Sequence, residues 1–550
     1  MFPRIKRSGK YEYLQLAETR REGGKVRQKV LLTIGRMDRL RKAGQIERLV
    51  GGLSRFSEKI AVLTEQGGAG ETEAEGMRIG PGMIFGRIWK EEGIGQILKE
   101  CADGRKYGFE MERAIFLTVL HRVCEPGSDR QGDKWRWGYK IPGTEGVELH
   151  HLYRAMAWLG EELSEEEQTG ATRFSPRCTK DQIEEELFAR KRDLFSGLEL
   201  VFFDTTSIYF EGDGGETLGE YGHTKDYRAD EKQMVVGVVL DERGNPICSE
   251  MWPGNVTDVE SLVPVVKRLR DRFGIGRICI VADRGMVSKE TVEYLEKEGG
   301  MEYILGMRMR RVTEVKEDVL GRAGRYQEVR AARTTGKQPA PLLVKEVRVK
   351  ESRYIVCHNP EEAATDRMAR ESLLEHLEKQ LKQGAKSLVG NKGYRKYLKV
   401  QGDSFRIDEK RVEEEARYDG KWVLRTNTGL SADAVALKYK ELLLVENIFR
   451  TMKSIVETRP VYHKRDATIR GHVFCSFLAI KLLKELQRRL EDHGHRFEWN
   501  DIRRDLTELQ EVQVESKGKK FIVRTTCKGT CGAIFQAVGV SLPPTIRMLQ

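Results

Sequence analysis

"LELVFFDTTSIYFEG" at residues 198–212 begins with an almost unbroken apolar run and then reaches an aspartate, Asp204. A run of this kind is typical of a central strand that is covered on both faces of its sheet. A second run, "RICIVADRGM" at residues 277–286, reaches Asp283 in the same way. Taken singly, each aspartate is better explained as the cap of a turn or helix. Taken together, they are expected at the carboxyl ends of strands, where sites gather in open α/β sheets.

A third carboxylate lies in the most apolar helical stretch, "LLLVENIFRTMKS" at residues 442–454. At 100° per residue, Glu446 falls opposite the apolar line of the predicted helix. That line is formed by Leu437, Leu444, Ile448 and Ile455, and the side of Glu446 carries Tyr439, Arg450 and Lys453.

Two interpretations of Glu446 compete. A surface pair with Arg450 would contribute only about 0.3–0.5 kcal/mol. The flanking Leu443, Val445 and Phe449 favour instead a covered carboxylate, which needs a partner such as a metal ion. Asp204, Asp283 and Glu446 together are what two Mg²⁺ ions require, with Mn²⁺ as a substitute, because Mg²⁺ prefers hard oxygen ligands. Such a pair of ions supports phosphoryl transfer, whereas Cys527 and Cys531 lack the second pair of a zinc site.

The order of predicted elements around the two aspartates is β-β-β-α-β-α-β over residues 198–310. The glutamate helix follows much later, after a less regular, strand-containing stretch at 311–433. Strand with Asp, hairpin, strand with Asp, strand and helix with Glu is the order of the ribonuclease-H-like fold. We therefore expect an α/β protein with a mixed sheet flanked by helices.

The residues also resemble a known family, the insertion-sequence transposases with a D-D-E triad and the Y-R-E-K signature, Y-x2-R-x3-E-x6-K. Tyr439, Glu446 and Lys453 match that spacing, and Leu442 stands at the arginine position. Further stretches look like the same family, namely "GHTKDYRADEKQ", "GNVTD", "IVADRGM" and "VENIFRTMKSIVETRPVYHKRDATIRGHVFCSFLA". The resemblance covers about 196–490 closely and the N-terminal parts more loosely.

The resemblance implies roles for these residues. Asp204, Asp283 and Glu446 would hold two Mg²⁺ ions, water would cut at the transposon end, and the freed 3′-hydroxyl would attack target DNA. Tyr439 and Lys453 would hold the backbone of the end. In the family the arginine shares that task, so Leu442 is a departure, and Arg450 on the same predicted face could substitute for it. The family also implies a homodimer that pairs two ends in a synaptic complex.

Other polar residues are softer candidates for DNA contact. His223, Lys225 and Arg228 belong to the loop after the first strand, where phosphate contacts and a plain turn are both reasonable. Arg284 follows Asp283 directly. Arg459 and His463 belong to "RPVYHKR", which mixes basic and aromatic groups as DNA contact would.

Basic charge is concentrated at the N-terminus. The chain has a net charge of +11, and residues 1–50 hold 14 Lys and Arg against 5 acids. Clustered basic charge indicates a polyanionic partner, most simply nucleic acid, although a solubilising terminus is the plainer alternative. The same segment contains two stretches that are typical of strands around the turn "EGGK".

At 550 residues several domains are expected. The boundaries that we predict are 1–66 (basic β-hairpin segment, DNA binding), 67–80 (linker), 81–195 (helical DNA-binding or dimerisation region), 196–310 (first part of the catalytic core), 311–433 (β-rich insertion domain), 434–495 (second part of the core) and 496–550 (small α/β region). The nine cysteines and the lack of a signal peptide or membrane-length apolar run predict a cytoplasmic protein, associated with the nucleoid when it binds DNA.

Three functions remain open from the residues: a transposase, a nuclease of the same fold that does not join strands, and a DNA-binding protein that has lost catalysis. All three acids of the triad are present, which disfavours the last.

Overall fold

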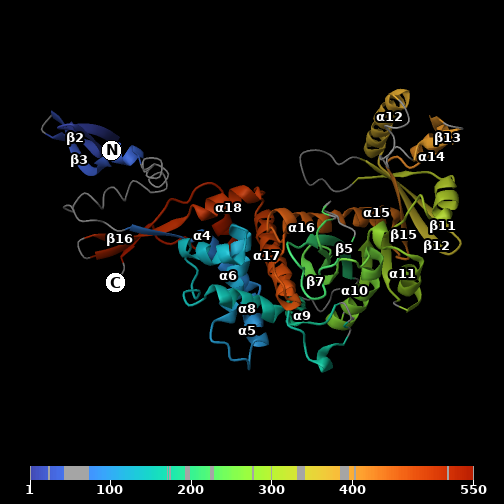
Figure 1. The fold of residues 1–550 in the computed structure, drawn as a ribbon, viewed down its shortest axis with the longest axis horizontal. Helices are drawn as coiled ribbons and strands as arrows, with labels where there is room; N and C mark the ends of the chain where they lie inside the picture. Colours follow the sequence, from blue (N-terminus) through green and yellow to red (C-terminus); the bar gives the residue numbers. More distant parts are fainter. Residues whose placement is uncertain are drawn as a thin grey trace. The chain divides into compact units, whose positions relative to one another are not determined.

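The computed structural model describes residues 2–22, 25–42, 74–169, 171, 175–191, 199–222, 228, 230–274, 278–298, 300–330, 341–383, 396–401, 404–516 and 519–548. The chain divides into two compact units. The first comprises Met1–Gly160, Ser454–Glu457 and Arg470–Gln550, and the second comprises Glu161–Lys453 and Thr458–Ile469. Both units are drawn in Figure 1.

The first unit is mainly helical. Its helices are α1 (Met37–Lys42), α4 (Gly80–Glu91), α5 (Ile94–Cys101), α6 (Met111–Cys124), α7 (Asp129–Trp135), α8 (Leu149–Leu159), α18 (Trp499–Thr507) and α19 (Cys531–Val538). Residues of α6 are buried almost throughout, as expected for a central helix that its neighbours surround. Of the helices expected within residues 81–195, those up to α8 belong to this unit, whereas α9 (Thr179–Lys191) belongs to the second unit.

Two small sheets belong to the first unit. One joins β1 (Phe2–Ser8), β2 (Tyr11–Glu22) and β3 (Lys25–Arg36), so the expected N-terminal hairpin has a third strand. The other has the order β18-β17-β16-β4, from β4 (Ala74–Arg78), β16 (Gln510–Ser516), β17 (Lys519–Arg524) and β18 (Ile546–Met548). Residues 74–78, which we expected to be linker, thus pair with the C-terminal region. Gly and Glu content suggested a linker there, but the partner strand lies more than 400 residues away and cannot be recognised locally.

A nine-stranded sheet forms the second unit, in the order β10-β11-β12-β15-β9-β8-β5-β6-β7. Its strands are β5 (Glu199–Tyr209), β6 (Gln233–Leu240), β7 (Pro246–Pro253), β8 (Ile278–Ala282), β9 (Glu302–Gly306), β10 (Gln327–Val329), β11 (Leu342–Val349), β12 (Ser352–His358) and β15 (Lys421–Thr426). The order of elements from β5 to β9 is the predicted one. The mixed α/β fold class is confirmed.

The insertion expected at 311–433 is only partly separate from the core sheet. Its strands β10, β11, β12 and β15 extend the core sheet, because β15 pairs with β9 from Leu424↔Gly306 to Thr426↔Ile304. A smaller part of the insertion stands apart from this sheet, with β13 (Leu398–Gln401), β14 (Ser404–Ile407), α12 (Pro360–Gln383) and α14 (Glu409–Ala416) around Leu377 and Tyr397.

Helices cover the sheet of the second unit. These are α9 (Thr179–Lys191), α10 (Asp258–Phe273), α11 (Lys289–Glu293), α15 (Ala432–Lys440) and α16 (Leu443–Ser454), and α17 (Asp466–Asp492) begins in this unit and continues into the first. Val201 and Phe203 of β5 pack in one core with Leu262 and Val265 of α10. Since side chains alternate along a strand, Asp204 points to the opposite face.

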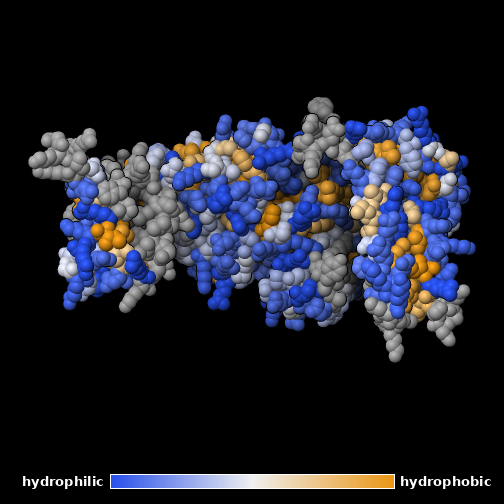
Figure 2. All heavy atoms as spheres, turned by 90° about the horizontal axis from the view of Figure 1, so that it is seen from above, coloured by the Kyte–Doolittle hydropathy of each residue, from blue (hydrophilic) through white to orange (hydrophobic). Residues whose placement is uncertain are grey.

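The face of the molecule drawn in Figure 2 is largely polar. Figure 2 shows hydrophilic side chains over most of the face that it draws, with hydrophobic ones in small patches. No helix among the described residues is long and apolar enough to span a membrane.

Candidate active site

Asp204 and Asp283 lie side by side on neighbouring parallel strands. The pairing of β5 with β8 runs to Phe203↔Ala282, and Asp204 and Asp283 are the residues that come next along the chain. Asp283 follows the end of β8, as expected, but Asp204 lies inside β5 rather than at its end. The reason is that β5 continues to Tyr209 along its other neighbour, the antiparallel strand β6. Because Asp204 still lies beside Asp283, the two carboxylates can form a site at the end of β8.

Glu446 of α16 joins the two aspartates in the lining of one cavity of about 530 Å³. The other lining residues are Arg284, Gly306, Met307, Met309, Glu362, Trp422, Val423, Tyr439, Lys440, Leu442 and Leu443. Sequence reasoning missed Glu362, Trp422 and Lys440, because they come from three separate elements of the 311–440 stretch and carry no common spacing.

The prediction that Glu446 is covered is wrong, because its side chain is exposed. Leu443, one of the apolar neighbours on which that prediction rested, is 54 % exposed. The helix is also broken: α15 ends at Lys440 and α16 begins at Leu443. Rotation angles counted across residues 437–455 as one helix are therefore not valid, and the buried side of α16 is formed by Val445, Ile448, Phe449 and Met452.

Tyr439 holds the carboxylate of Asp283. Its phenolic Oη donates a hydrogen bond of 2.9 Å to Asp283 Oδ1. Burial and the neighbouring charge of Asp283 raise the pKa of Tyr439 well above its ordinary value, so the phenol keeps its proton. Gly306 makes room for this contact, since a Cβ there would lie 2.4 Å from Tyr439 Oη and 2.9 Å from the backbone nitrogen of Arg284.

Arg308 fixes the backbone that follows Asp283. Its Nε donates to the carbonyl oxygen of Arg284 at 3.0 Å, and its Nη2 donates to that of Gly285 at 2.9 Å. A guanidinium presents these donors in a rigid fork, so it can hold two successive carbonyl groups at once. No sequence pattern indicates this role, since Arg308 is one of several arginines in "RMRR".

Asp258 supports the neighbouring strand. Thr205 Oγ1 donates to Asp258 Oδ1 at 2.5 Å, and the backbone nitrogen of Thr205 donates to Asp204 Oδ1 at 2.7 Å. Asp258 thus contacts the residue next to Asp204 from the first turn of α10. It ends the stretch "GNVTD", which resembles the family but suggested no role by itself.

The predicted DNA-contacting residues are placed unequally. Arg284 lines the cavity, whereas Arg450 is exposed and Lys453 half-buried on α16, outside the lining residues described above. Arg228 and Arg459 come together over the ring of Tyr209, at 5.1 and 5.6 Å from its centroid.

Arg228 is also paired with Glu231 at 3.0 Å. His223 and Lys225 lie outside the described residues.

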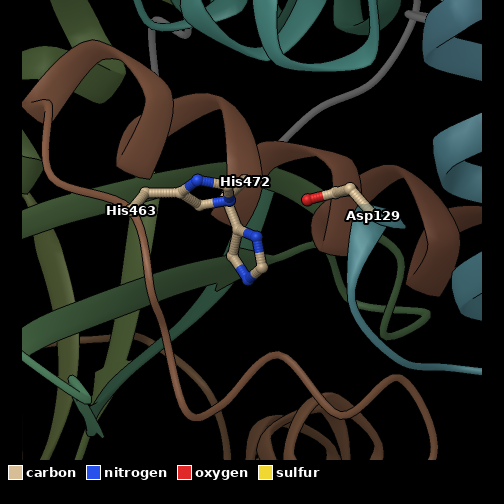
Figure 3. Close-up of side chains that lie close together, drawn as sticks. All are labelled: Asp129, His463 and His472. Carbon is tan, nitrogen blue, oxygen red and sulfur yellow. The ribbon is translucent and has the colours of Figure 1, made fainter. Parts of the chain in front are cut away.

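Figure 3 draws the side chains of Asp129, His463 and His472. His463 belongs to the second unit, and the other two belong to the first. Within the first unit, Arg122 Nη2 lies 2.8 Å from His472 Nδ1 and 3.9 Å from Asp129 Oδ1. Asp129 and His472 therefore serve there as partners of a buried guanidinium.

The donor set of the cavity fits a hard divalent cation. Asp204, Asp283 and Glu446 offer carboxylate oxygens, and the described lining includes neither histidine nor cysteine. Oxygen-only ligand sets favour Mg²⁺ or Mn²⁺ over zinc.

Comparison with known families agrees with this geometry. The model of the transposase DDE domain matches residues 196–482, which is more than half of the chain. The model of the N-terminal domain of IS1634 family transposases matches residues 3–67. No curated protein matches the chain.

Proposed function

Because the chain belongs to the DDE transposases, which are DNA-cleaving and DNA-transferring enzymes that use divalent metals, we propose that it binds the terminal inverted repeats of its element, cleaves there and joins the 3′-hydroxyl ends to target DNA. The observation that supports this most is the convergence of Asp204, Asp283 and Glu446 on one cavity. Its two aspartates come from adjacent strands and its glutamate from a separate helix.

The chemistry follows from the oxygen donors. Two Mg²⁺ ions, with Mn²⁺ as a substitute, would activate the attacking oxygen and stabilise the leaving oxygen when the three carboxylates hold them. Tyr439 keeps the Asp283 carboxylate oriented through its hydrogen bond. Arg308 keeps the backbone after Asp283 in place.

Joining is an exchange of phosphodiesters. The 3′-oxygen of the end forms a P–O bond to the target phosphate as the target strand's own P–O3′ bond breaks. The attacking hydroxyl loses one proton and the leaving 3′-oxygen gains one, so no oxidant or nucleotide is consumed.

DNA contacts would extend beyond the cavity. The basic segment 1–66 and the helical region 81–195 would bind the end, and Tyr439, Arg450, Lys453, Arg284, Arg459 and His463 would contact DNA nearer the cut. A homodimer would pair two ends in a synaptic complex. Because these basic residues and segments would contact DNA phosphates, the affinity for DNA would fall steeply as the salt concentration rises.

The test uses purified full-length protein with a labelled duplex of the element's own end, a second target duplex and Mg²⁺. Wild type is compared with Glu446→Gln, and Glu441→Gln serves as the matched control. Glu441 lies five residues earlier, outside the cavity lining described above, and contacts Lys438 at 3.3 Å. We expect wild type and Glu441→Gln to nick and join, and Glu446→Gln to bind the end without doing either.

Each other outcome has a clear meaning. Nicking without joining would show a nuclease of the same fold instead of a transposase. Binding without nicking by wild type would contradict the proposed chemistry.

A further inference from the structure

A second cavity of about 350 Å³ adjoins the catalytic one. It shares Asp283, Arg284 and Met309 with the catalytic cavity, but its described lining lacks Asp204 and Glu446. The remaining lining residues are Gly285, Arg308, Arg310 and Arg311, so we call it the arginine cavity.

Two of its four arginines are already engaged. Arg308 donates to the carbonyl oxygens of Arg284 and Gly285. Arg310 Nε lies 3.1 Å from both carboxylate oxygens of Glu415, and its guanidinium lies 4.6 Å from the centroid of the Tyr418 ring. These contacts restrain the side chains of Arg308 and Arg310, which line the arginine cavity.

The other two arginines are available. Arg284 and Arg311 are exposed. Within the described part of the chain, no hydrogen bond or ion pair engages either guanidinium. The guanidinium groups of Arg284 and Arg311, beside the restrained side chains of Arg308 and Arg310, form a suitable site for phosphate oxygens, which arginine binds with paired N–H donors.

The chemistry of joining requires a second phosphodiester at the same carboxylates. The catalytic cavity holds all three acids together with Tyr439 and Lys440, and it would receive the transposon end. The described lining of the arginine cavity includes Asp283 but not Asp204 or Glu446. DNA bound in this cavity would therefore lie next to the triad, on the side of Asp283.

We propose, on the basis of the proposed function, that the arginine cavity binds backbone phosphates of the target DNA strand during joining. Arg311 contacts a target phosphate there, and Arg284 bridges the two cavities. In the joining step, the target phosphorus gains a bond to the 3′-oxygen of the end and loses its bond to the target's 3′-oxygen. That oxygen takes up a proton, and the attacking hydroxyl gives one up.

The test separates cleavage from joining in Arg311→Gln. Arg325→Gln is the matched control, because Arg325 is also exposed and lies outside the described lining of the cavity. Three quantities are measured: nicking of the labelled end, joining to a target duplex, and the affinity for that target duplex alone over a series of KCl concentrations, by fluorescence anisotropy. Thermal unfolding of each variant checks that it is folded.

We expect Arg311→Gln to join about tenfold more slowly, as for the loss of one charge-assisted hydrogen bond, while end nicking stays within about twofold of wild type. The slope of log affinity against log salt should become shallower by about one. Arg311→Lys should recover part of the joining, and Arg325→Gln should match wild type.

The proposal is overturned if Arg311→Gln joins as fast as wild type, or if nicking and joining fall together. If wild type itself neither nicks nor joins, the proposed function is wrong, and target binding alone decides about the cavity. In that case, a slope of log affinity against log salt that is unchanged in Arg311→Gln would overturn the proposed role of the arginine cavity, and a shallower slope would support that role.

Discussion

Tyr439 contacts Asp283 directly, although the family resemblance suggested a role in holding DNA. Its Oη donates to Asp283 Oδ1 at 2.9 Å, and burial with the charge of Asp283 raises the pKa of the phenol. The two roles are not exclusive, because Tyr439 also lines the cavity. They differ in what the loss of the hydroxyl group should change.

We expect Tyr439→Phe to cleave about tenfold more slowly and to need more Mg²⁺ for half-maximal cleavage, because one charge-assisted hydrogen bond to a metal ligand is lost. The affinity for the end, measured without Mg²⁺, should stay within about twofold. A large loss of affinity with an unchanged Mg²⁺ requirement would show instead that Tyr439 acts mainly on DNA. Since the phenol of Tyr439 keeps its proton, deprotonation of Tyr439 should not appear in the pH dependence of the cleavage rate between pH 7 and 9.

His121 makes the first unit sensitive to acid. Its side chain is 2 % exposed, and its Nε2 has no hydrogen-bond partner among the described residues. Burial lowers the pKa of His121 to about 4, from 6.5. The unfolded chain therefore binds more protons between these values, and the free energy of unfolding falls as the pH is lowered through this window.

We expect this loss to approach about 3 kcal/mol between pH 6.5 and 4. Thermal unfolding of wild type should therefore shift downwards over that range, and His121→Gln should shift less. Glu485 titrates lower: burial raises its pKa, but hydrogen bonds from Arg488 and Arg489 lower it to about 2, so its contribution is lost only below about pH 4.5. Equal acid shifts in wild type and His121→Gln would contradict this account.

At the scale of elements, helix α9 is held by buried charges. Arg272 of α10 contacts Asp181 at 3.1 Å, Glu184 at 3.0 Å and Glu185 at 2.6 Å. Lys180 adds a contact of 2.7 Å to Asp181 and donates to the carbonyl oxygen of Ser249 on β7. Removing one partner leaves unpaired charges in the interior, which is strongly destabilising.

We expect Arg272→Met to lower the free energy of unfolding of this region by about 3–5 kcal/mol. Hydrogen exchange of the α9 amides in native buffer should accelerate accordingly. Arg270→Met is the control, because Arg270 is exposed and contacts only Asp271, at 3.7 Å, among the pairs described. A surface pair of this kind contributes less than about 1 kcal/mol. Equal exchange rates in the two variants would refute the role of Arg272.

Elements also show where sequence reasoning succeeds and fails. The apolar runs before Asp204 and Asp283 predicted two central strands, because burial on both faces leaves a direct trace in composition. The break between α15 and α16 left no such trace: residues 441 and 442 are Glu and Leu, which are good helix formers. The exposure of Glu446 follows from that break and from tertiary packing.

At the scale of the whole molecule, most strands in the long interval between Asp283 and Glu446 belong to the core sheet. The length of this interval suggested a separate domain, but β15 pairs with β9 and makes one sheet with the core. Pairing between strands more than 100 residues apart leaves no local signal in a single sequence. Two residues that support Asp283 lie next to the junction of β9 and β15. Gly306 leaves room for Tyr439, and Arg308 donates to the carbonyl oxygen of Arg284.

We therefore expect deletion of residues 311–433, with a short Gly-Ser linker in their place, to prevent the core from folding. The deletion exposes the edge of β9 and removes Val347, Tyr354 and Val423 from the core. Deletion of 1–73 is the control, because β1, β2 and β3 pair only with one another among the described strands. Circular dichroism and limited proteolysis would follow both variants. A cooperatively folded core without 311–433 would contradict this prediction.

The central claim is that Asp204, Asp283 and Glu446 are metal ligands for DNA cleavage, and metal rescue tests it most directly. Asp204→Cys, Asp283→Cys and Glu446→Cys are assayed for end nicking in Mg²⁺ and in Mn²⁺. A thiolate binds the softer Mn²⁺ better than Mg²⁺. We predict that the cysteine variants are inactive in Mg²⁺ and regain nicking in Mn²⁺ beyond any gain of wild type. Nicking by these variants in Mg²⁺ at the wild-type rate would contradict the claim. The claim would also be contradicted if none of the three variants gained more nicking activity from Mn²⁺ than wild type does.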